Sequence, residues 1–312
     1  MTFKDLNLLG KKREPFLFIS DFKAKKLKVI SLDKLKDEDI EFCIDSKYRY
    51  KIHNNIFVKK SISFKKYKTK FDLIQEHIKN GDTYLLNLTQ PTQIKSDLSL
   101  KEIYSLANAH YKLRFKDKFV CFSPESFIQI KENKIHTYPM KGTIDASIEN
   151  AKEKILNNQK EMAEHVMVVD LLRNDLSIVS RGVKVEKFRY IQTIDAGERE
   201  LLQVSSHISG ELNDDWHENI GDILASLLPA GSISGTPKKK TLEIIQQVEE
   251  YERGYFSGVF GIYDGKSLDS GVMIRFVEKQ EGGYIYKSGG GITCDSDVLQ
   301  EYNELQDKIY LP

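Results

Sequence analysis

Short apolar segments separated by charged turns fill the N-terminal part of the chain, and their pattern constrains the fold more than any other feature. They lie at residues 16–19, 27–30, 41–44 and 56–62, and such segments are typical of antiparallel strands. Further strands are predicted at 83–89, 119–123, 126–131, 135–138, 183–190, 201–208, 254–263, 270–278 and 284–287. Helical periodicity covers 67–80, 100–113, 149–177, 216–228, 238–250 and the C-terminus. Because strands and helices do not follow the regular rhythm of a parallel βαβ sheet, we expect antiparallel sheet accompanied by helices.

The charge of the chain is balanced. Its 312 residues include 47 Lys and Arg and 46 Asp and Glu, which gives a net charge of +1. No overall field would attract nucleic acid or an anionic membrane, and we expect neither as a partner. An anionic ligand must therefore be held by charges local to its site.

The N-terminus and the cysteines indicate the compartment. Residues 1–15 lack an apolar core of signal-peptide length, and no segment approaches the roughly 20 apolar residues that span a bilayer. Cys43, Cys121 and Cys294 lie far apart without metal-type pairing, which suits free thiols in a reducing compartment. We expect a cytoplasmic protein.

One lysine lies where chemistry is possible. Lys141 follows the strand predicted over 134–138 and precedes Gly142, a residue at which backbone can approach a ligand closely. A lysine becomes a nucleophile only in a desolvated, electropositive pocket, and otherwise it is a solvated loop residue. Glu125 lies in the turn after residue 123 and, across a hairpin, could share a pocket with Lys141, or it is an exposed turn residue. The residue pattern leaves both alternatives open.

Two helices each carry a pair of glutamates. Glu161 and Glu164 are three residues apart, as are Glu301 and Glu304, so that each pair projects from one helix face. Crowded carboxylates repel one another unless a cation lies among them, and an all-oxygen set favours Mg2+. A di-iron site would need histidines beside the glutamates, and none accompanies the second pair. Each pair taken alone is also typical of a solvated helix face.

Residues 229–238 form a glycine-containing segment before a predicted helix. Its backbone N–H groups could meet an anion. It is not a Walker A motif, because Gly231 and Gly235 have only three residues between them and no Gly-Lys-Ser/Thr follows. A nucleotide site is disfavoured.

Four segments, taken together, resemble the chorismate-utilising family, whose members make anthranilate, aminodeoxychorismate, isochorismate and salicylate. They are Ser123-Pro-Glu125 followed by Pro139-Met-Lys-Gly-Thr143, the run 164–176, Gly231-Ser-Ile-Ser-Gly-Thr-Pro-Lys238, and 289–292 leading to Glu301, Glu304 and Lys308. The resemblance extends from Pro15 to the C-terminus. It implies an α+β fold in which two antiparallel sheets pack as a sandwich with helices outside. We expect one catalytic domain over 1–312, with a strand-rich part (1–95) and a part carrying most site residues (96–312).

The resemblance also implies roles for individual residues. Mg2+ would be held by the four glutamates, directly or through water, and would bind the ring carboxylate of chorismate. Glu125 matches the general acid that protonates the departing C4 hydroxyl. The expected substrate-binding residues are Thr143, Arg275, Gly290, Gly291 and Lys308.

Lys141 indicates the branch of the family. A lysine in this motif marks the members that make 4-amino-4-deoxychorismate for p-aminobenzoate and folate, and its implied role is to attack C2 of the ring before ammonia adds at C4. The nearest alternative is anthranilate synthesis, and a noncatalytic relative is a further one. Leu85 stands where isochorismate and salicylate synthases have a lysine, which disfavours both. Leu85, Gln203 and Phe256 depart from the residues usual in amine-transferring members.

The nitrogen source is expected to be a partner. Glutamine-hydrolysing subunits use a cysteine in a Gly-x-Cys-x-Gly elbow, and none of the three cysteines has these flanking glycines. Ammonia would therefore come from a separate glutamine amidotransferase subunit.

Overall fold

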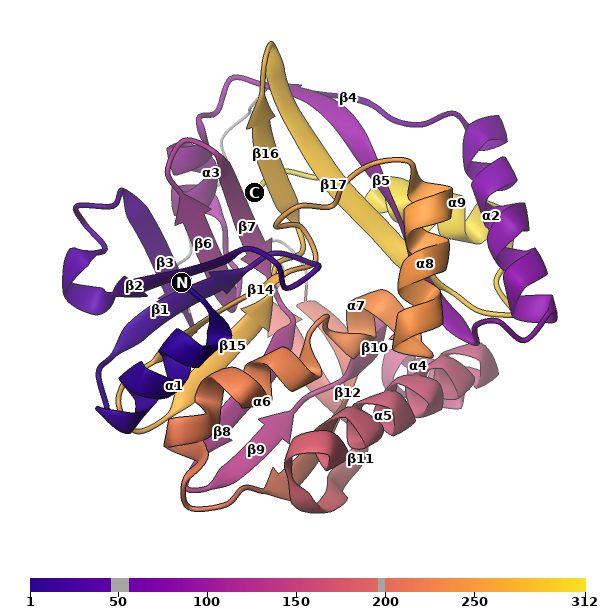
Figure 1. Ribbon diagram of the computed structural model, residues 1–312. Coiled ribbons are helices and arrows are strands. Elements are labelled where there is room, and N and C mark those ends of the chain that lie inside the picture. The colour runs from indigo at the N-terminus through magenta and orange to yellow at the C-terminus, as the bar shows by residue number, and fades with distance from the viewer. Residues whose placement is uncertain (46–55, 196–199) are drawn as a thin grey trace. The chain divides into compact units, whose positions relative to one another are not determined.

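The computed structural model describes residues 1–45, 56–195 and 200–312 (Figure 1). The chain forms two compact units, each assembled from three stretches of sequence. Unit 1 comprises Met1–Leu32, Glu125–Ser232 and Val259–Val272, and unit 2 comprises Asp33–Pro124, Ile233–Gly258 and Met273–Pro312. The expected single catalytic domain with a division near residue 95 remains a prediction.

Unit 1 contains a nine-stranded sheet in the order β10-β12-β9-β8-β15-β14-β1-β2, with β11 also paired to β12. Every pairing in it is antiparallel. Its strands are β1 (Phe16–Ser20), β2 (Leu27–Ser31), β8 (Ser126–Lys131), β9 (Lys134–Thr137), β10 (Met140–Asp145), β11 (Arg181–Asp195), β12 (Glu200–Glu211), β14 (Val259–Tyr263) and β15 (Leu268–Val272).

The helices of unit 1 are α1 (Phe3–Lys11), α4 (Ala151–Asn157), α5 (Gln159–Val179), the 3-10 turn η2 (Trp216–Asn219) and α6 (Ile220–Leu227). Figure 1 shows the N-terminal α1 beside α6, although the two are far apart in the sequence. Two glycines permit this approach: a Cβ on Gly221 would lie 1.7 Å from the Phe3 carbonyl oxygen, and one on Gly10 would lie 1.9 Å from that of His217.

Unit 2 contains an eight-stranded sheet in the order β13-β5-β17-β16-β7-β6-β3, with β4 paired to β5. These pairings are also all antiparallel. The strands are β3 (Ile40–Ile44), β4 (Phe57–Lys60), β5 (Leu85–Ser96), β6 (Tyr111–Phe115), β7 (Phe119–Ser123), β13 (Gly235–Thr236), β16 (Phe276–Gln280) and β17 (Gly283–Ile292). The helices are α2 (Phe64–Lys79), α3 (Leu100–Leu106), α8 (Lys238–Glu249) and α9 (Val298–Asp307), while η1 (Leu32–Lys34) and α7 (Gly231–Ser234) lie where the chain passes between the units.

The prediction of antiparallel sheets with helices is confirmed, and several element predictions were wrong in detail. The strand expected over 254–263 begins only at Val259. The helix expected over 100–113 ends at Leu106, and β6 begins at Tyr111. The helical pattern over 149–177 is two helices, because Asn158 ends α4 and caps α5 by accepting a hydrogen bond from the Glu161 N–H (3.1 Å). The segment 284–287 extends through the glycines to Ile292.

The strand expected over 270–278 is two strands in different sheets. β15 ends at Val272 in unit 1, and β16 begins at Phe276 in unit 2. Between them Arg275 has φ +51°, a left-handed conformation that a continuous strand cannot contain. The break leaves Arg275, an expected ligand of the substrate, outside both ladders.

No helix in the described ranges is both long and apolar enough to cross a bilayer.

Candidate active site

Lys141 lies inside a strand rather than after one. β10 pairs with β12, and the register shifts between Met140 and Thr143, so that Lys141 and Gly142 form a β-bulge. Gly142 has φ +80°, which glycine adopts without strain. A bulge re-aims the side chains that it carries, and here the Lys141 side chain is directed to helix α5.

Helix α5 brings both glutamates of its pair to this bulge. Lys141 Nζ donates to Glu164 Oε2 at 3.3 Å, and the two side chains are 25% and 11% exposed. A Cβ on Gly142 would lie 3.1 Å from Glu161 Oε2. Within unit 1, the Glu161 and Glu164 side chains therefore both lie beside the Lys141-Gly142 bulge.

A buried histidine fixes α5 against the sheet beside these glutamates. His165 is fully buried, and its Nε2 is hydrogen bonded to Ser206 Oγ at 2.7 Å. The Ser206 N–H donates to the Pro139 carbonyl oxygen at 3.0 Å, one residue before β10 begins. Burial, together with the charges of Arg189 and Lys141, lowers the pKa of the His165 imidazole to about 4. The imidazole is therefore neutral near pH 7.

Glu125, at the start of β8, is held by a serine. Ser232 Oγ donates to Glu125 Oε1 at 2.5 Å, and the Glu125 carbonyl accepts from the Val272 N–H at 3.0 Å. Both the side chain and the backbone of Glu125 are therefore held by hydrogen bonds. Ser232 was not predicted as a site residue. The sequence signal for Ser232 is its place in the motif 231–238, where only the backbone N–H groups had a predicted role.

The C-terminal residues form a matching arrangement in unit 2. A Cβ on Gly290 of β17 would lie 3.3 Å from Glu301 Oε2 and 3.7 Å from both Glu304 Oε1 and Lys308 Nζ. Lys308 Nζ is 2.5 Å from Glu304 Oε1 and donates to the Gly289 carbonyl oxygen at 2.9 Å. The space in front of Gly290 is thus bounded by two carboxylates and one ammonium group, all carried by α9 and the residue that follows it.

Glu301 is buried and Glu304 is exposed. The buried carboxylate accepts a hydrogen bond from Ser296 Oγ at 2.9 Å, which offsets part of its desolvation. No sequence pattern singled out Ser296, because its role depends on the turn before α9.

The remaining expected residues lie as follows. Arg275 is half-buried, with its guanidinium 5.7 Å from the centre of the Tyr310 ring. Gly291 is buried in β17 opposite Asn87, and Thr143 is exposed in β10 opposite Gln203. Within unit 1 the structure thus brings Lys141, Glu161 and Glu164 together, and within unit 2 it brings Gly290, Glu301, Glu304 and Lys308 together.

The three residues that depart from the family pattern all have buried side-chain atoms. Leu85 is buried and pairs with Thr236, so its side chain serves the core of unit 2. Phe256 is buried, with its ring 5.9 Å from that of Phe276. Gln203 Oε1 is buried and has no hydrogen-bond partner among the described residues.

The donor chemistry fits Mg2+, although the arrangement is not a finished coordination sphere. Each unit presents two carboxylates from one helix face, and carboxylate oxygens are the ligands that Mg2+ prefers. Across residues 1–45, 56–195 and 200–312, no cluster of three or more His, Cys, Asp or Glu side chains is poised around a common metal position. The magnesium site therefore remains a prediction.

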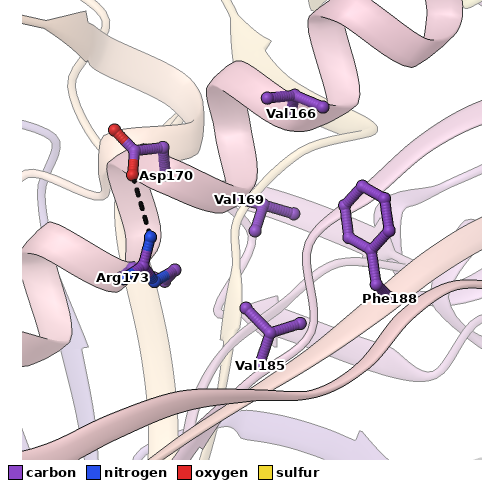
Figure 2. Close-up of a pocket in the computed structure, with 6 residues that line it drawn as sticks. All are labelled: Val166, Val169, Asp170, Arg173, Val185 and Phe188. Carbon is purple, nitrogen blue, oxygen red and sulfur yellow. Dashed lines mark hydrogen bonds and ion pairs between the residues drawn. The ribbon is translucent and has the colours of Figure 1, made fainter.

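A separate groove lies between α5 and β11. Val166, Val169, Asp170, Arg173, Val185 and Phe188 line it. Figure 2 shows Arg173 paired with Asp170 at one end and Phe188 at the other. None of the predicted site residues lines this groove.

A family model described as chorismate binding enzyme matches residues 35–311. The chain belongs to this family. It is therefore a chorismate-utilising enzyme, and the resemblance inferred from the four motifs is confirmed.

Individual relatives agree with this assignment. An uncharacterised PabA-like protein of Haemophilus influenzae is 48% identical over 310 residues, covering 98% of this chain and 94% of that protein. Aminodeoxychorismate synthase component 1 of Salmonella typhimurium is 32% identical over 259 residues, covering 78% of this chain and 56% of that protein. A crystal structure described as a 2,3-dihydroxybenzoate-specific isochorismate synthase, DhbC, from Bacillus anthracis has a TM-score of 0.73, 19% identity, and coverage of 98% and 87%. The last comparison confirms the fold.

Proposed function

We propose that the chain is an aminodeoxychorismate synthase component I, which converts chorismate and ammonia to 4-amino-4-deoxychorismate for p-aminobenzoate and folate synthesis. The observation that carries the proposal is Lys141, displayed on the β10 bulge with its Nζ 3.3 Å from Glu164 Oε2. A primary amine at this place can form a covalent bond to the substrate. The 32% identity to an aminodeoxychorismate synthase component 1 supports the same branch.

In the proposed reaction, Lys141 displaces the C4 hydroxyl and is then displaced by ammonia. Its amine attacks C2 of chorismate and loses a proton, both ring double bonds shift, and the C4–oxygen bond breaks. Glu125 supplies a proton to the departing hydroxyl, which leaves as water. Ammonia then adds at C4 and loses a proton, both double bonds shift back, and the C2–nitrogen bond breaks to release Lys141 as an amine that takes up this proton. Two allylic displacements replace one direct substitution.

The groups around Gly290 would hold the substrate. Lys308, Arg275 and the backbone N–H groups of Gly290 and Gly291 are proposed to bind carboxylates, and Thr143 is proposed as a further contact. Glu161, Glu164, Glu301 and Glu304 are proposed to hold Mg2+, which when bound would neutralise the ring carboxylate. Carboxylates alone would repel the dianionic substrate, so the glutamates make sense at a chorismate site only with a cation.

The source of ammonia would be a separate glutamine amidotransferase subunit. Cys121 is buried, Cys43 is half-buried and Cys294 is exposed, and none lies in a Gly-x-Cys-x-Gly segment. Burial raises the pKa of the Cys121 thiol, which suppresses the thiolate that a nucleophile needs. The chain would thus accept ammonia and would not release it from glutamine.

A product assay tests the proposal. Purified chain is incubated with chorismate, Mg2+ and ammonium, and the products are identified by mass spectrometry. The expected product is 4-amino-4-deoxychorismate without pyruvate. Anthranilate together with pyruvate would instead assign the chain to anthranilate synthesis, and unchanged chorismate would contradict both activities.

A further inference from the structure

The outer edge of β5 is interrupted beside the glycine strand. β13 pairs with Leu85 and Leu86, and β4 pairs with residues 93–96. Between these two stretches the described residues pair with β5 on one side only, through β17. Because successive peptide groups in a strand point to opposite edges, the Asn87 carbonyl and the Thr89 N–H face the edge at which no described strand pairs. A buried peptide group without a hydrogen-bond partner destabilises the folded state.

An ion pair from the end of α8 takes the place of the missing strand. Arg253 donates from Nη2 to the Asn87 carbonyl oxygen at 2.7 Å, and Glu249 Oε1 accepts from the Thr89 N–H at 2.8 Å and from its Oγ at 2.7 Å. The pair is bidentate, with Arg253 Nε 2.8 Å from Glu249 Oε2 and Nη2 2.6 Å from Oε1. Its side chains are only 2% and 1% exposed.

The same pair reaches the other elements around β5. Arg253 Nη1 donates to the Ile233 carbonyl oxygen at 3.1 Å, just before β13. The Arg253 carbonyl oxygen accepts from Lys287 Nζ of β17 at 3.0 Å. The Arg253 side chain therefore joins β5 to α7, and Lys287 of β17 holds the Arg253 backbone.

The stretch of β5 that they hold is the one opposite the candidate ligand strand. Asn87, Leu88 and Thr89 pair with Gly291, Gly290 and Gly289. The contact is close, because a Cβ on Gly289 would lie 2.4 Å from the Leu88 carbonyl oxygen. A shift of β5 would therefore carry the glycine strand with it and change the spacing between Gly290 and the Glu301, Glu304 and Lys308 side chains.

We propose that Glu249 and Arg253 are positioning residues that complete the open edge of β5 and thereby fix Gly290 and Gly291 for binding a carboxylate of the substrate. The proposal rests on the proposed function for the identity of the ligand. It makes no use of that function for the positioning itself. Neither residue touches the substrate, so their loss should weaken substrate binding more than the chemical step.

A simple contribution to stability is the alternative, and Arg114 provides a matched control. It is also a buried arginine of unit 2, with a 7% exposed side chain that binds Glu41 and Asp39. Arg114 lies on β6, which is separated from β17 by β16 and β7 in the sheet order. Arg114→Lys should therefore cost stability without moving the glycines.

The experiment compares Glu249→Gln, Arg253→Lys and the milder Thr89→Val with Arg114→Lys in the full chain. Amide hydrogen exchange is measured at residue 89 and at Gly290 and Gly291, and kcat and KM are measured with chorismate and ammonium. We expect exchange at these amides to accelerate about tenfold or more in the first three variants, the factor that corresponds to one ordinary hydrogen bond. KM for chorismate should rise by about the same factor, with kcat changed less than about threefold.

The control separates the outcomes. Arg114→Lys should leave both the exchange at these glycines and KM at the wild-type value. Unchanged exchange and unchanged KM in folded Glu249→Gln and Thr89→Val would overturn the proposal, as would equal effects from Arg114→Lys. If the wild-type chain leaves chorismate unchanged, the proposed function fails, and the exchange measurements still decide whether the pair positions the glycines.

Discussion

Ser232 Oγ donates a hydrogen bond of 2.5 Å to Glu125 Oε1. The bond connects the residue proposed as general acid to the short helix α7. Glu125→Gln keeps the shape of the side chain but has no transferable acid proton, so kcat should fall about 10²- to 10⁴-fold. Steady-state kinetics with ammonium measures this, and a loss of less than about threefold would show that another group protonates the leaving hydroxyl.

Removing only the serine hydroxyl should have a smaller effect. Ser232→Ala leaves the carboxyl group in place but frees its orientation, and we expect kcat to fall about tenfold, the equivalent of one ordinary hydrogen bond. Ser234→Ala is the matched control, because Ser234 belongs to the same helical turn. Equal losses from the two serine variants would argue against a specific role for the Ser232–Glu125 bond.

Removal of divalent metal should abolish activity. Excess EDTA is expected to stop turnover and added Mg2+ to restore it, since the carboxylates otherwise repel the substrate. Glu304→Gln should raise the Mg2+ concentration needed for half-maximal activity about tenfold or more and weaken Mg2+ binding in calorimetry. Asp307→Asn, an exposed carboxylate at the end of the same helix, should change neither value. Full turnover in excess EDTA would refute the metal requirement.

The purified chain should use ammonium and ignore glutamine. At a fixed total concentration of ammonium, the rate should rise with pH, because only the unprotonated fraction is nucleophilic. Adding the cognate amidotransferase should make glutamine a substrate. Turnover of glutamine by the chain alone, with contaminating amidotransferase excluded, would contradict the proposed division of labour.

Stability should fall on acidification partly through His217. The imidazole is 7% exposed, its Nδ1 is 2.7 Å from the Tyr263 hydroxyl, and its Nε2 accepts from the Arg13 guanidinium. Since arginine can only donate, the folded state holds His217 neutral. Burial, with a contribution from Arg13, lowers its pKa to about 4.

The unfolded chain, with an ordinary histidine pKa near 6.5, binds more protons between that value and about 4. Stability therefore rises with pH across this window and is lost as pH falls through it, by an amount on the order of 3 kcal/mol. Chemical denaturation at pH 7, 5.5 and 4.5 should show that the free energy of unfolding depends less steeply on pH in His217→Asn than in wild type. Equal slopes in wild type and His217→Asn would rule out this contribution.

Local spacing predicted the parts of the site that depend on one helix. Glu161 and Glu164 project from one face of α5, and Glu301 and Glu304 both approach Gly290, because three-residue spacing dictates the direction of a side chain on a helix. The strands of the N-terminal part followed from short apolar segments separated by charged turns. The class of fold was thus accessible from the sequence.

Features that depend on contacts between distant segments of the chain could not be predicted from the sequence. The bulge at Lys141 exists only because β12 pairs with β10 in two registers, and a single-strand pattern does not contain that information. The bond between Ser232 and Glu125 joins residues 107 positions apart. The break at Arg275 required knowledge that β15 and β16 enter different sheets.

The central claim is the covalent role of Lys141, and trapping the intermediate tests it most directly. The chain is incubated with chorismate and Mg2+ in the absence of ammonia, digested, and analysed by peptide mass spectrometry, with Lys141→Ala and the exposed Lys131→Ala as comparison variants. We predict an adduct on the peptide containing Lys141 with the mass of chorismate less one water, its discharge to 4-amino-4-deoxychorismate on addition of ammonium, and its loss together with most turnover only in Lys141→Ala. Wild-type turnover by Lys141→Ala would contradict the account.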